Sequence, residues 1–158
     1  MANGTADFEG DLLLNLTEDG GELQIENGLF MPDKSFATSV LISLFGGNIE
    51  DAGKVENRSG WWGNYTGAPD NKIQSRFQAI TNGQPLTVAS AKEAVNAAKL
   101  DLAWIIDNGI ADDISIHGTI GGVKRFDMEV ILSKDGTEIY KNKYAINWEA
   151  QRNSGTTK

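Results

Sequence analysis

The chain contains no cysteine and only one histidine, His117. The first absence excludes disulfide bridges, thiolate catalysis and cysteine-based metal sites, and it fits a protein made in a reducing compartment. A single imidazole cannot supply a histidine metal cluster, and it leaves His117 as the one histidine that could act as a general base for a serine. We interpret His117 as a structural or solvent-exposed side chain at the end of a short strand.

Long apolar runs and clusters of positive charge are also missing. No run of about 18 apolar residues occurs, and the segment from Met1 to Ala6 lacks the features of a secretion signal, so we expect no membrane partner. The 14 Lys and Arg residues are outnumbered by 22 Asp and Glu residues, which gives a formal net charge of −8. This balance argues against a nucleic-acid partner, because binding to phosphates requires a basic surface.

The size and apolar content fit one hydrophobic core. The 158 residues are 40% apolar, which is enough for a single domain without disulfides. Residues 1–10 and 151–158 are small, polar and without periodicity, so we expect a flexible arm and a flexible tail. The folded domain is therefore predicted to span residues 11–150.

The N-terminal half predicts a hairpin, a helix and a long connection. Leucine and isoleucine alternate with other residues over 12–25, and Asp19-Gly20-Gly21 in the middle favours a turn between two strands. Apolar residues at helical spacing predict a helix over 36–45 that ends at Gly46-Gly47. Residues 46–72 are rich in Gly, Pro, Asn and Asp, which is typical of an irregular connection.

The C-terminal half predicts one long helix followed by strands. The helix begins near Thr87 and Ser90, where Ser90 and Glu93 could form a capping box, and it ends at Asn108-Gly109. Alternating apolar residues then predict three strands, with a turn at Asp135-Gly136 and a second, glycine-rich turn. The predicted strands cover 114–116, 126–132 and 137–148, and the glycine-rich turn covers 118–122. The fold class is α+β, with an N-terminal β-hairpin, two main helices and a C-terminal antiparallel sheet packed on the long helix.

Two adjacent tryptophans framed by glycines form the most distinctive motif of the sequence. It reads Arg58-Ser59-Gly60-Trp61-Trp62-Gly63-Asn64. Glycine permits unusual backbone conformations and close approach, and each indole has a large apolar body with one N–H that needs a partner when buried. The pair either anchors its own loop or, with Tyr65, forms an exposed platform on which sugars or a protein partner could stack.

The same motif resembles the Arg-Gly-Trp-Trp-Gly-Asp signature of the gene product 46 family of Mu-like phages. Ser59 stands where a second arginine is usual, and Asn64 replaces the aspartate, so an ion pair expected from the family pattern is in doubt. The apolar segment 39–45 and the segment 72–77, which includes Arg76, are similar to two further family segments in the same order. The resemblance extends over roughly residues 11 to 150.

The resemblance implies a non-enzymatic structural protein of a contractile phage tail. Such a protein sits in the tail baseplate of the virion, after assembly in the cytoplasm of the bacterial host, and is similar to the wedge and sheath-initiator proteins of the gene product 25 family. Its implied partners are other baseplate wedge proteins and the tail sheath protein, in a ring of sixfold symmetry. The signature residues Arg58, Gly60, Trp61, Trp62, Gly63 and Asn64, together with Arg76, are the implied structural or partner-binding motif.

The resemblance further implies that the C-terminal strands initiate the sheath. An edge strand over 137–148 would offer free backbone N–H and C=O groups to an incoming strand. The residues expected along this edge are Ile139, Lys141, Lys143, Ala145 and Trp148. Lysines on an edge strand normally discourage uncontrolled pairing, so a merely protected edge is the alternative interpretation.

The residues themselves point to no reaction, cofactor or metal. A glycoside hydrolase would need a pair of carboxylates, but no pair stands out from the solvated acidic residues of the predicted loops. We found no phosphate-binding loop, dinucleotide fingerprint or calcium loop. The alternative function is therefore a carbohydrate-binding or polysaccharide-degrading tail protein that uses the platform of Trp61 and Trp62.

Overall fold

The computed structural model describes residues 11–12, 14–17, 20–23, 25–30, 32–33, 36–47 and 73–148. The chain divides into two compact units, Met1–Val40 and Leu41–Lys158. The proposed arm and tail, 1–10 and 151–158, lie outside the described residues. The extent of a single domain over 11–150 stays a prediction.

The first unit consists of short antiparallel strand pairs. The strands β2 (Leu14–Thr17) and β3 (Gly20–Leu23) form the predicted N-terminal hairpin, and β1 (Asp11–Leu12) pairs with β6 (Pro32–Asp33). Thr17 pairs with Gly20, so Gly20 and Gly21 belong to β3. Their assignment to the turn was wrong, because the register closes the hairpin before Gly20.

A second hairpin was not predicted. It joins β4 (Ile25–Glu26) to β5 (Leu29–Phe30) through Asn27 and Gly28, whose φ angles are 53° and 79°. Two successive residues in the left-handed region form the turn that connects tightly paired strands, and Asn-Gly is the dipeptide that adopts it most readily.

The helix α1 (Ala37–Phe45) confirms the helix predicted over 36–45 except at its first residue. Phe36 has a φ angle of 57° and lies before the helix, although its carbonyl accepts the N–H of Val40. The predicted stop is confirmed: Gly47 has a φ angle of 84°, a conformation that glycine adopts without steric strain.

Residues 73–148 contain three helices: α3 (Arg76–Gly83), α4 (Val88–Asp101) and α5 (Ala103–Asp107). The sequence did not predict α3, and it predicted α4 and α5 as one helix. The break falls at Leu102, where Ile105 donates to the carbonyl of Leu102, three residues back, as in a 3₁₀ turn.

The ends of this helical pair show which capping residues act. The N-terminal capping box consists of Thr87 and Ser90, so the expected pairing of Ser90 with Glu93 was wrong. At the other end Gly109 has a φ angle of 68°, and the next N–H, of Ile110, donates to the carbonyl of Ile105. The predicted glycine cap is confirmed.

The second unit also contains a three-stranded antiparallel sheet in the order β7-β8-β9. Its strands are β7 (Asp113–Gly122), β8 (Arg125–Lys134) and β9 (Thr137–Asn147), and the predicted turn at Asp135-Gly136 is confirmed by φ angles of 50° and 75°. Residues 118–122 lie within β7, and all of them except Gly121 pair with β8, so their assignment to a turn was wrong.

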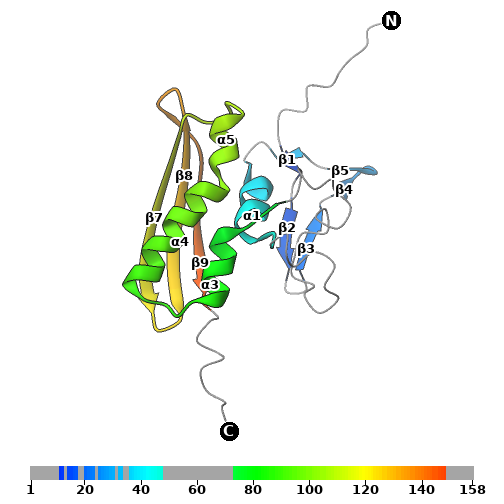
Figure 1. Ribbon diagram of the computed structural model, residues 1–158. Coiled ribbons are helices and arrows are strands. Elements are labelled where there is room, and N and C mark those ends of the chain that lie inside the picture. The colour runs from blue at the N-terminus through cyan, green and yellow to red at the C-terminus, as the bar shows by residue number, and fades with distance from the viewer. Residues whose placement is uncertain are drawn as a thin grey trace, which may run out of the picture. The chain divides into compact units, whose positions relative to one another are not determined.

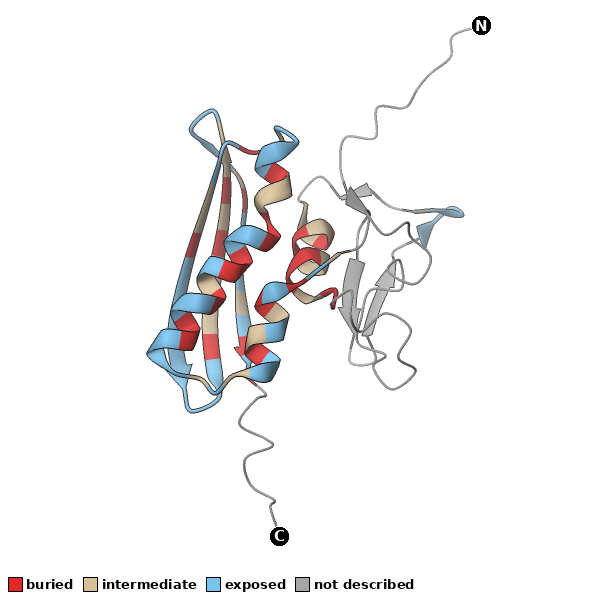
Figure 2. Cartoon of the chain, in the orientation of Figure 1, coloured by how far each residue is buried: buried red, intermediate tan, exposed pale blue. Residues whose placement is uncertain are grey.

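One face of this sheet carries the core. Helices α3 and α4 cover it (Figure 1), and buried side chains alternate along β8 while the residues between them are only partly covered (Figure 2). The buried residues of the sheet are Ile116, Phe126, Met128, Val130, Leu132, Tyr140 and Ile146. The buried residues of α4 include Ala91, Ala94, Ala97 and Ala98, whose small side chains let the helix lie close to the strands.

The α+β class is thus confirmed, with the N-terminal hairpin and with the C-terminal sheet packed on the long helix. In the part of the chain that the structure describes, none of the helices is long and apolar enough to cross a membrane.

Candidate functional site

The predicted site residues fall into two groups. The tryptophan motif, 58–64, lies outside the described residues, and its two interpretations stay open. Arg76 and the edge residues Ile139, Lys141, Lys143, Ala145 and Trp148 lie within the second unit, so their surroundings can be examined directly.

The segment that resembles the family around Arg76 joins α1 to α3. The buried hydroxyl of Ser75 accepts the N–H of Gly46 at 3.0 Å and donates to the carbonyl of Ser43 at 2.8 Å. Nearby, the side-chain carbonyl of Gln78 accepts the N–H of Gly47 at 2.8 Å. These hydrogen bonds fasten the C-terminal end of α1 to Ser75 and to the first turn of α3.

Arg76 itself binds a carboxylate of its own chain. Its guanidinium lies 3.2 Å from the carboxylate of Asp101, whose side chain is fully buried while that of Arg76 is 48% exposed. Burial raises the pKa of Asp101, and hydrogen bonds from the backbone of Phe77 and from Arg76 oppose this effect. Phe77 in turn packs edge-to-face on Phe45, with ring centroids 5.6 Å apart. In the structure Arg76 therefore ties α3 to α4.

A hydrogen bond just after β9 shows which N–H groups of this strand point towards β8 and which point away from it. The N–H of Trp148 donates to the carbonyl of Lys124, which precedes β8, at 2.7 Å. Because backbone groups alternate in direction along an antiparallel strand, the N–H groups of Lys141, Lys143 and Ala145 point away from β8. Ile139 is an extra residue at a register shift, since Tyr140 pairs with Leu132 and Glu138 with Ser133.

The β9 edge is protected by its own side chains. The outward N–H of Lys143 donates to the side-chain carbonyl of Asn142 at 2.9 Å. The ammonium groups of Lys141 and Lys143 lie 3.7 and 3.6 Å from the carboxylate of Glu129 on β8. Charged side chains and an occupied donor are both features that discourage a foreign strand from pairing.

Trp148 lies just beyond β9 and is fully buried. Its indole N–H donates to the carbonyl of Gln84, and its ring packs edge-to-face on Phe126 at 5.6 Å between centroids. Of the residues expected along the edge, this one fastens the end of the strand to the segment after α3. Its side chain presents no surface to a partner.

The other edge of the sheet is β7. Every second residue of β8 directs its backbone N–H and C=O groups to β9, so the residues between them direct theirs to β7. Ser133 is one of these residues, and its carbonyl accepts the N–H of Asp112 at 2.8 Å. It follows that the outward backbone groups of β7 belong to Ile114, Ile116, Gly118 and Ile120. This edge was not predicted from the sequence, because residues 118–122 were assigned to a turn.

A groove of about 750 Å³ runs between β7 and α4. The helix contributes Val88, Ala91, Lys92, Val95 and Asn96, and the strand contributes residues 116–120. Gly118 is required here: an added Cβ would collide with the ring of Phe126 and come within 2.7 Å of a methyl group of Val95. The alternation of small and large residues therefore sets how closely helix and strand approach.

The opposite face of the sheet holds a smaller hollow of about 410 Å³, which His117 helps to line. Contrary to the prediction, His117 lies in the middle of β7, where its Nε2 is 3.2 Å from the hydroxyl of Ser115. Both side chains are outside the core, and within the described residues no carboxylate orients the other ring nitrogen, as a catalytic triad requires. Residues 73–148 and the other described segments contain no group of three or more metal-ligating side chains.

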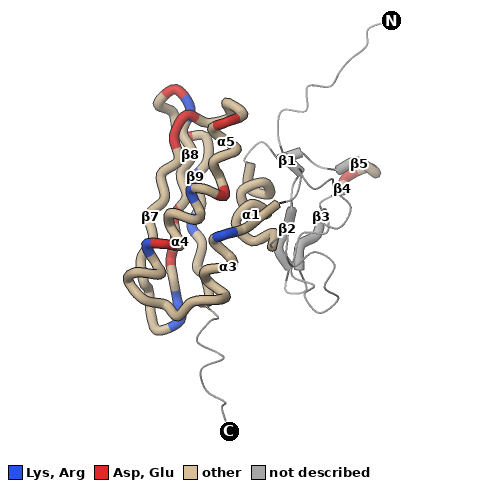
Figure 3. The backbone as a smooth tube through the Cα atoms, viewed as in Figure 1, with Lys and Arg blue, Asp and Glu red and all other residues tan. Residues whose placement is uncertain are grey.

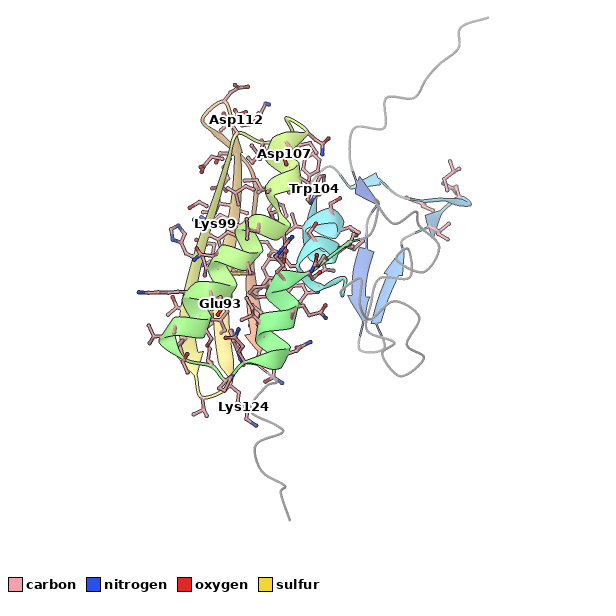
Figure 4. All side chains as sticks on the ribbon, viewed as in Figure 1. Glu93, Lys99, Trp104, Asp107, Asp112 and Lys124 are labelled. Atoms are coloured by element: carbon pink, nitrogen blue, oxygen red, sulfur yellow. The ribbon has the colours of Figure 1, made fainter. Side chains whose placement is uncertain are left out.

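Hydrogen bonds and an ion pair fix the end of the sheet next to Asp112. Asp112 and Lys124 lie at opposite ends (Figure 4). At the first end Asp112 accepts the N–H of Asp135 at 2.8 Å, and Lys134 lies 3.3 Å from Asp112 and donates to the carbonyl of Gly109 at 2.7 Å. These contacts bind the β8–β9 turn to the segment after α5.

A comparison with known families identifies the family of the chain. The family model described as "Phage protein GP46" matches residues 36–138, which is more than half of the chain. No curated protein and no solved structure matches the sequence.

Proposed function

Because the chain belongs to the phage protein GP46 family, we propose that it is a structural component of a contractile phage tail baseplate. In this role it resembles the wedge and sheath-initiator proteins, and it has no catalytic activity. The family membership is the observation that carries the proposal. Its place is the virion, in a sixfold ring that contacts other wedge proteins and the tail sheath protein.

The shape of the second unit supports a role in assembly. A three-stranded sheet has two edges, and the helices of residues 73–148 lie on one of its two faces (Figure 1). Addition of a strand from another protein at such an edge creates many backbone hydrogen bonds without a dedicated cavity. The side chains in and around the sheet form ion pairs and packing contacts, which also favours a structural role over a chemical one.

Genetics and particle composition test the baseplate role. We expect purified tails to contain this protein, and we expect deletion of its gene to yield particles without a complete baseplate and sheath, restored by the wild-type gene. Normal tails from the deletion strain, with no copy of the protein in purified wild-type particles, would contradict the proposal. So would turnover of peptidoglycan or capsular polysaccharide that is lost on changing a single Asp or Glu.

The β9 edge can be tested within the same system. Proline at Lys141 or Lys143 removes an outward N–H and leaves the hydrogen bonds to β8 in place. We expect tails with either variant to retain the protein but to lack an extended sheath. Alanine at the same positions is the matched control, since it removes the charge and keeps the N–H. Normal sheaths with both proline variants, with the fold verified by circular dichroism, would exclude β9 as the initiating strand.

A further inference from the structure

We propose that β7 and α4 form a second strand-binding site, which takes an extended segment of another tail protein. The segment is apolar at alternate positions and carries a carboxylate that pairs with Lys92. The proposal rests on the proposed function only for the source of the segment. Its chemistry follows from the backbone, the groove and the charges of the second unit.

The first argument is the open edge. Ile114, Ile116, Gly118 and Ile120 direct their backbone N–H and C=O groups away from β8, and among the described strands only β8 pairs with β7. At the usual rise of a strand, residues 114–120 expose an edge of roughly 20 Å. An extended partner of about six or seven residues would cover it.

The second argument is the groove beside this edge. A strand added to β7 would direct every second side chain towards α4, where the groove is lined largely by apolar and small residues. Val88 is 68% exposed and Ile120 is 39% exposed, although both border this groove. Burial of these side chains would add hydrophobic stabilisation to the backbone hydrogen bonds.

The third argument is the contrast in charge between the two edges. The tube in Figure 3 is almost free of charged residues along β7, whereas β9 carries basic residues. The β9 edge carries the two lysines and the occupied N–H of Lys143. In β7, by contrast, the one formally charged residue is Asp113, at the start of the strand. An unguarded, largely apolar edge of this length normally requires a partner or another form of protection.

The charge of the groove selects the kind of segment. Lys92 is exposed and is the one formally charged side chain among the described residues that line the groove. A carboxylate on the incoming strand would complement it. A second copy of this chain would bring the same cation to a twofold β7–β7 contact, so charge complementarity favours a different protein over self-association.

Amide hydrogen exchange of the purified full chain tests the open edge. In the free protein the outward amides of Ile114, Ile116, Gly118 and Ile120 should exchange faster than the amides between them, which bond to β8. Slow exchange of these four amides in a monomer would mean that the chain covers its own edge. Slow exchange together with a doubled mass in light scattering would mean self-pairing. Either result would overturn the proposal.

Binding is then measured with a defined probe, an acetylated and amidated peptide Thr-Val-Thr-Glu-Thr-Val-Thr, in which the glutamate lies on the same face as the valines. In ¹H–¹⁵N spectra we expect saturable shifts of amides in β7 and in the first half of α4, with protection of the four outward amides. A peptide methylated at alternate backbone nitrogens should lose this binding, because it cannot complete the ladder. The peptide is added up to about 1 mM, which would detect binding with a dissociation constant in that range. Absence of shifts at this concentration, or equal binding of the methylated peptide, would overturn the proposal.

Charge reversal provides the matched control. Lys92→Glu should weaken binding of the glutamate peptide by roughly two- to fivefold, the range of an exposed ion pair, and should favour a peptide with lysine in place of glutamate. Lys99→Glu makes the same change on α4 at an exposed position that does not line the groove (Figure 4), and should have no such effect. Equal effects of both variants would overturn the role of Lys92. Peptide binding is independent of tail assembly, so a failure here is distinguishable from a failure of the baseplate role.

Discussion

The carboxylate of Asp101, at the end of α4, accepts the backbone N–H of Phe77 in the first turn of α3 at 2.8 Å. This buried side chain thereby occupies a donor that the start of a helix leaves without an internal partner. The second oxygen of the same carboxylate faces Arg76. One residue of α4 thus fixes both the beginning and the orientation of α3.

Replacement of Asp101 should change how stability depends on pH. Its folded-state pKa is raised above the ordinary value of 3.8 by burial. Between these two values the folded chain binds more protons than the unfolded chain, so the contribution of Asp101 to the free energy of unfolding falls as pH rises through this window. Asp101→Asn removes this titration and keeps an acceptor for Phe77.

Urea unfolding of both proteins from about pH 3 to pH 8 measures the effect. Relative to Asp101→Asn, the free energy of unfolding of the wild type should fall as pH rises. The difference between the two proteins should become constant above the raised pKa of Asp101. Asp101→Ala should lose about 1–3 kcal/mol, since it leaves the N–H of Phe77 without its acceptor. Parallel pH curves for wild type and Asp101→Asn would contradict the assignment.

Gly118→Ala tests the close approach of strand and helix. The new methyl group would meet the rigid ring of Phe126 and the side chain of Val95, so we expect a loss of about 1–3 kcal/mol from overpacking. Gly121→Ala in the same strand is the matched control, because its methyl group would meet the carboxylate of Asp127, the end of an exposed and flexible side chain. Equal thermal midpoints for the two variants would show that β7 shifts without resistance.

Trp148 should be essential for stability rather than for pairing. Trp148→Ala removes a fully buried ring and should reduce the free energy of unfolding by about 3–5 kcal/mol. Trp148→Phe retains most of the contact with Phe126 but leaves the carbonyl of Gln84 without the indole donor, so its loss should be about 1–3 kcal/mol. Chemical denaturation distinguishes the two variants, and unchanged stability of the alanine variant would refute the anchoring role.

Trp61 and Trp62 remain the test of the alternative function. If one of them is a buried loop anchor, its replacement by alanine should destabilise the protein by about 3–5 kcal/mol. The two positions need separate measurements by thermal unfolding, with binding of soluble polysaccharides as the second assay. Unchanged thermal midpoints with loss of sugar or partner binding would instead identify an exposed platform.

The sequence predicts the parts of this fold that local chemistry determines. Strand periodicity, the Asp135-Gly136 turn and the cap at Gly109 each depend on neighbouring residues, and all three are confirmed. The hairpin at Asn27-Gly28 was equally accessible, because its dipeptide is a strong turn signal. The helix α3 gave little signal, since only Phe77 and Thr81 of its residues are buried.

The missed features of the site depend on distant residues. Gly118 looks like a turn residue, but its neighbours in space, Phe126 and Val95, require a position without a side chain inside a strand. Likewise, nothing local distinguishes Asp101 from other helix carboxylates, because its partner Phe77 lies 24 residues away in the sequence. The β7 edge could be recognised only once the register with β8 was known.

Asp112 should respond to pH in the direction opposite to Asp101. The N–H of Asp135 and the ammonium of Lys134 hold the pKa of Asp112 below its ordinary value of 3.8. Between the two values the unfolded chain binds more protons, so the stabilisation is present above 3.8 and is lost as pH falls through the lowered pKa. Asp112→Asn should therefore differ most from wild type at neutral pH and converge with it in acid. Asp113→Asn is the matched control. The carboxylate of Asp113 is exposed, lies next to Asp112 in the sequence and has no hydrogen bond within the described residues. Carboxyl ¹³C shifts followed through the acid titration measure the pKa directly, and an Asp112 midpoint at or above the ordinary value would show that the β8–β9 turn is not held by this carboxylate.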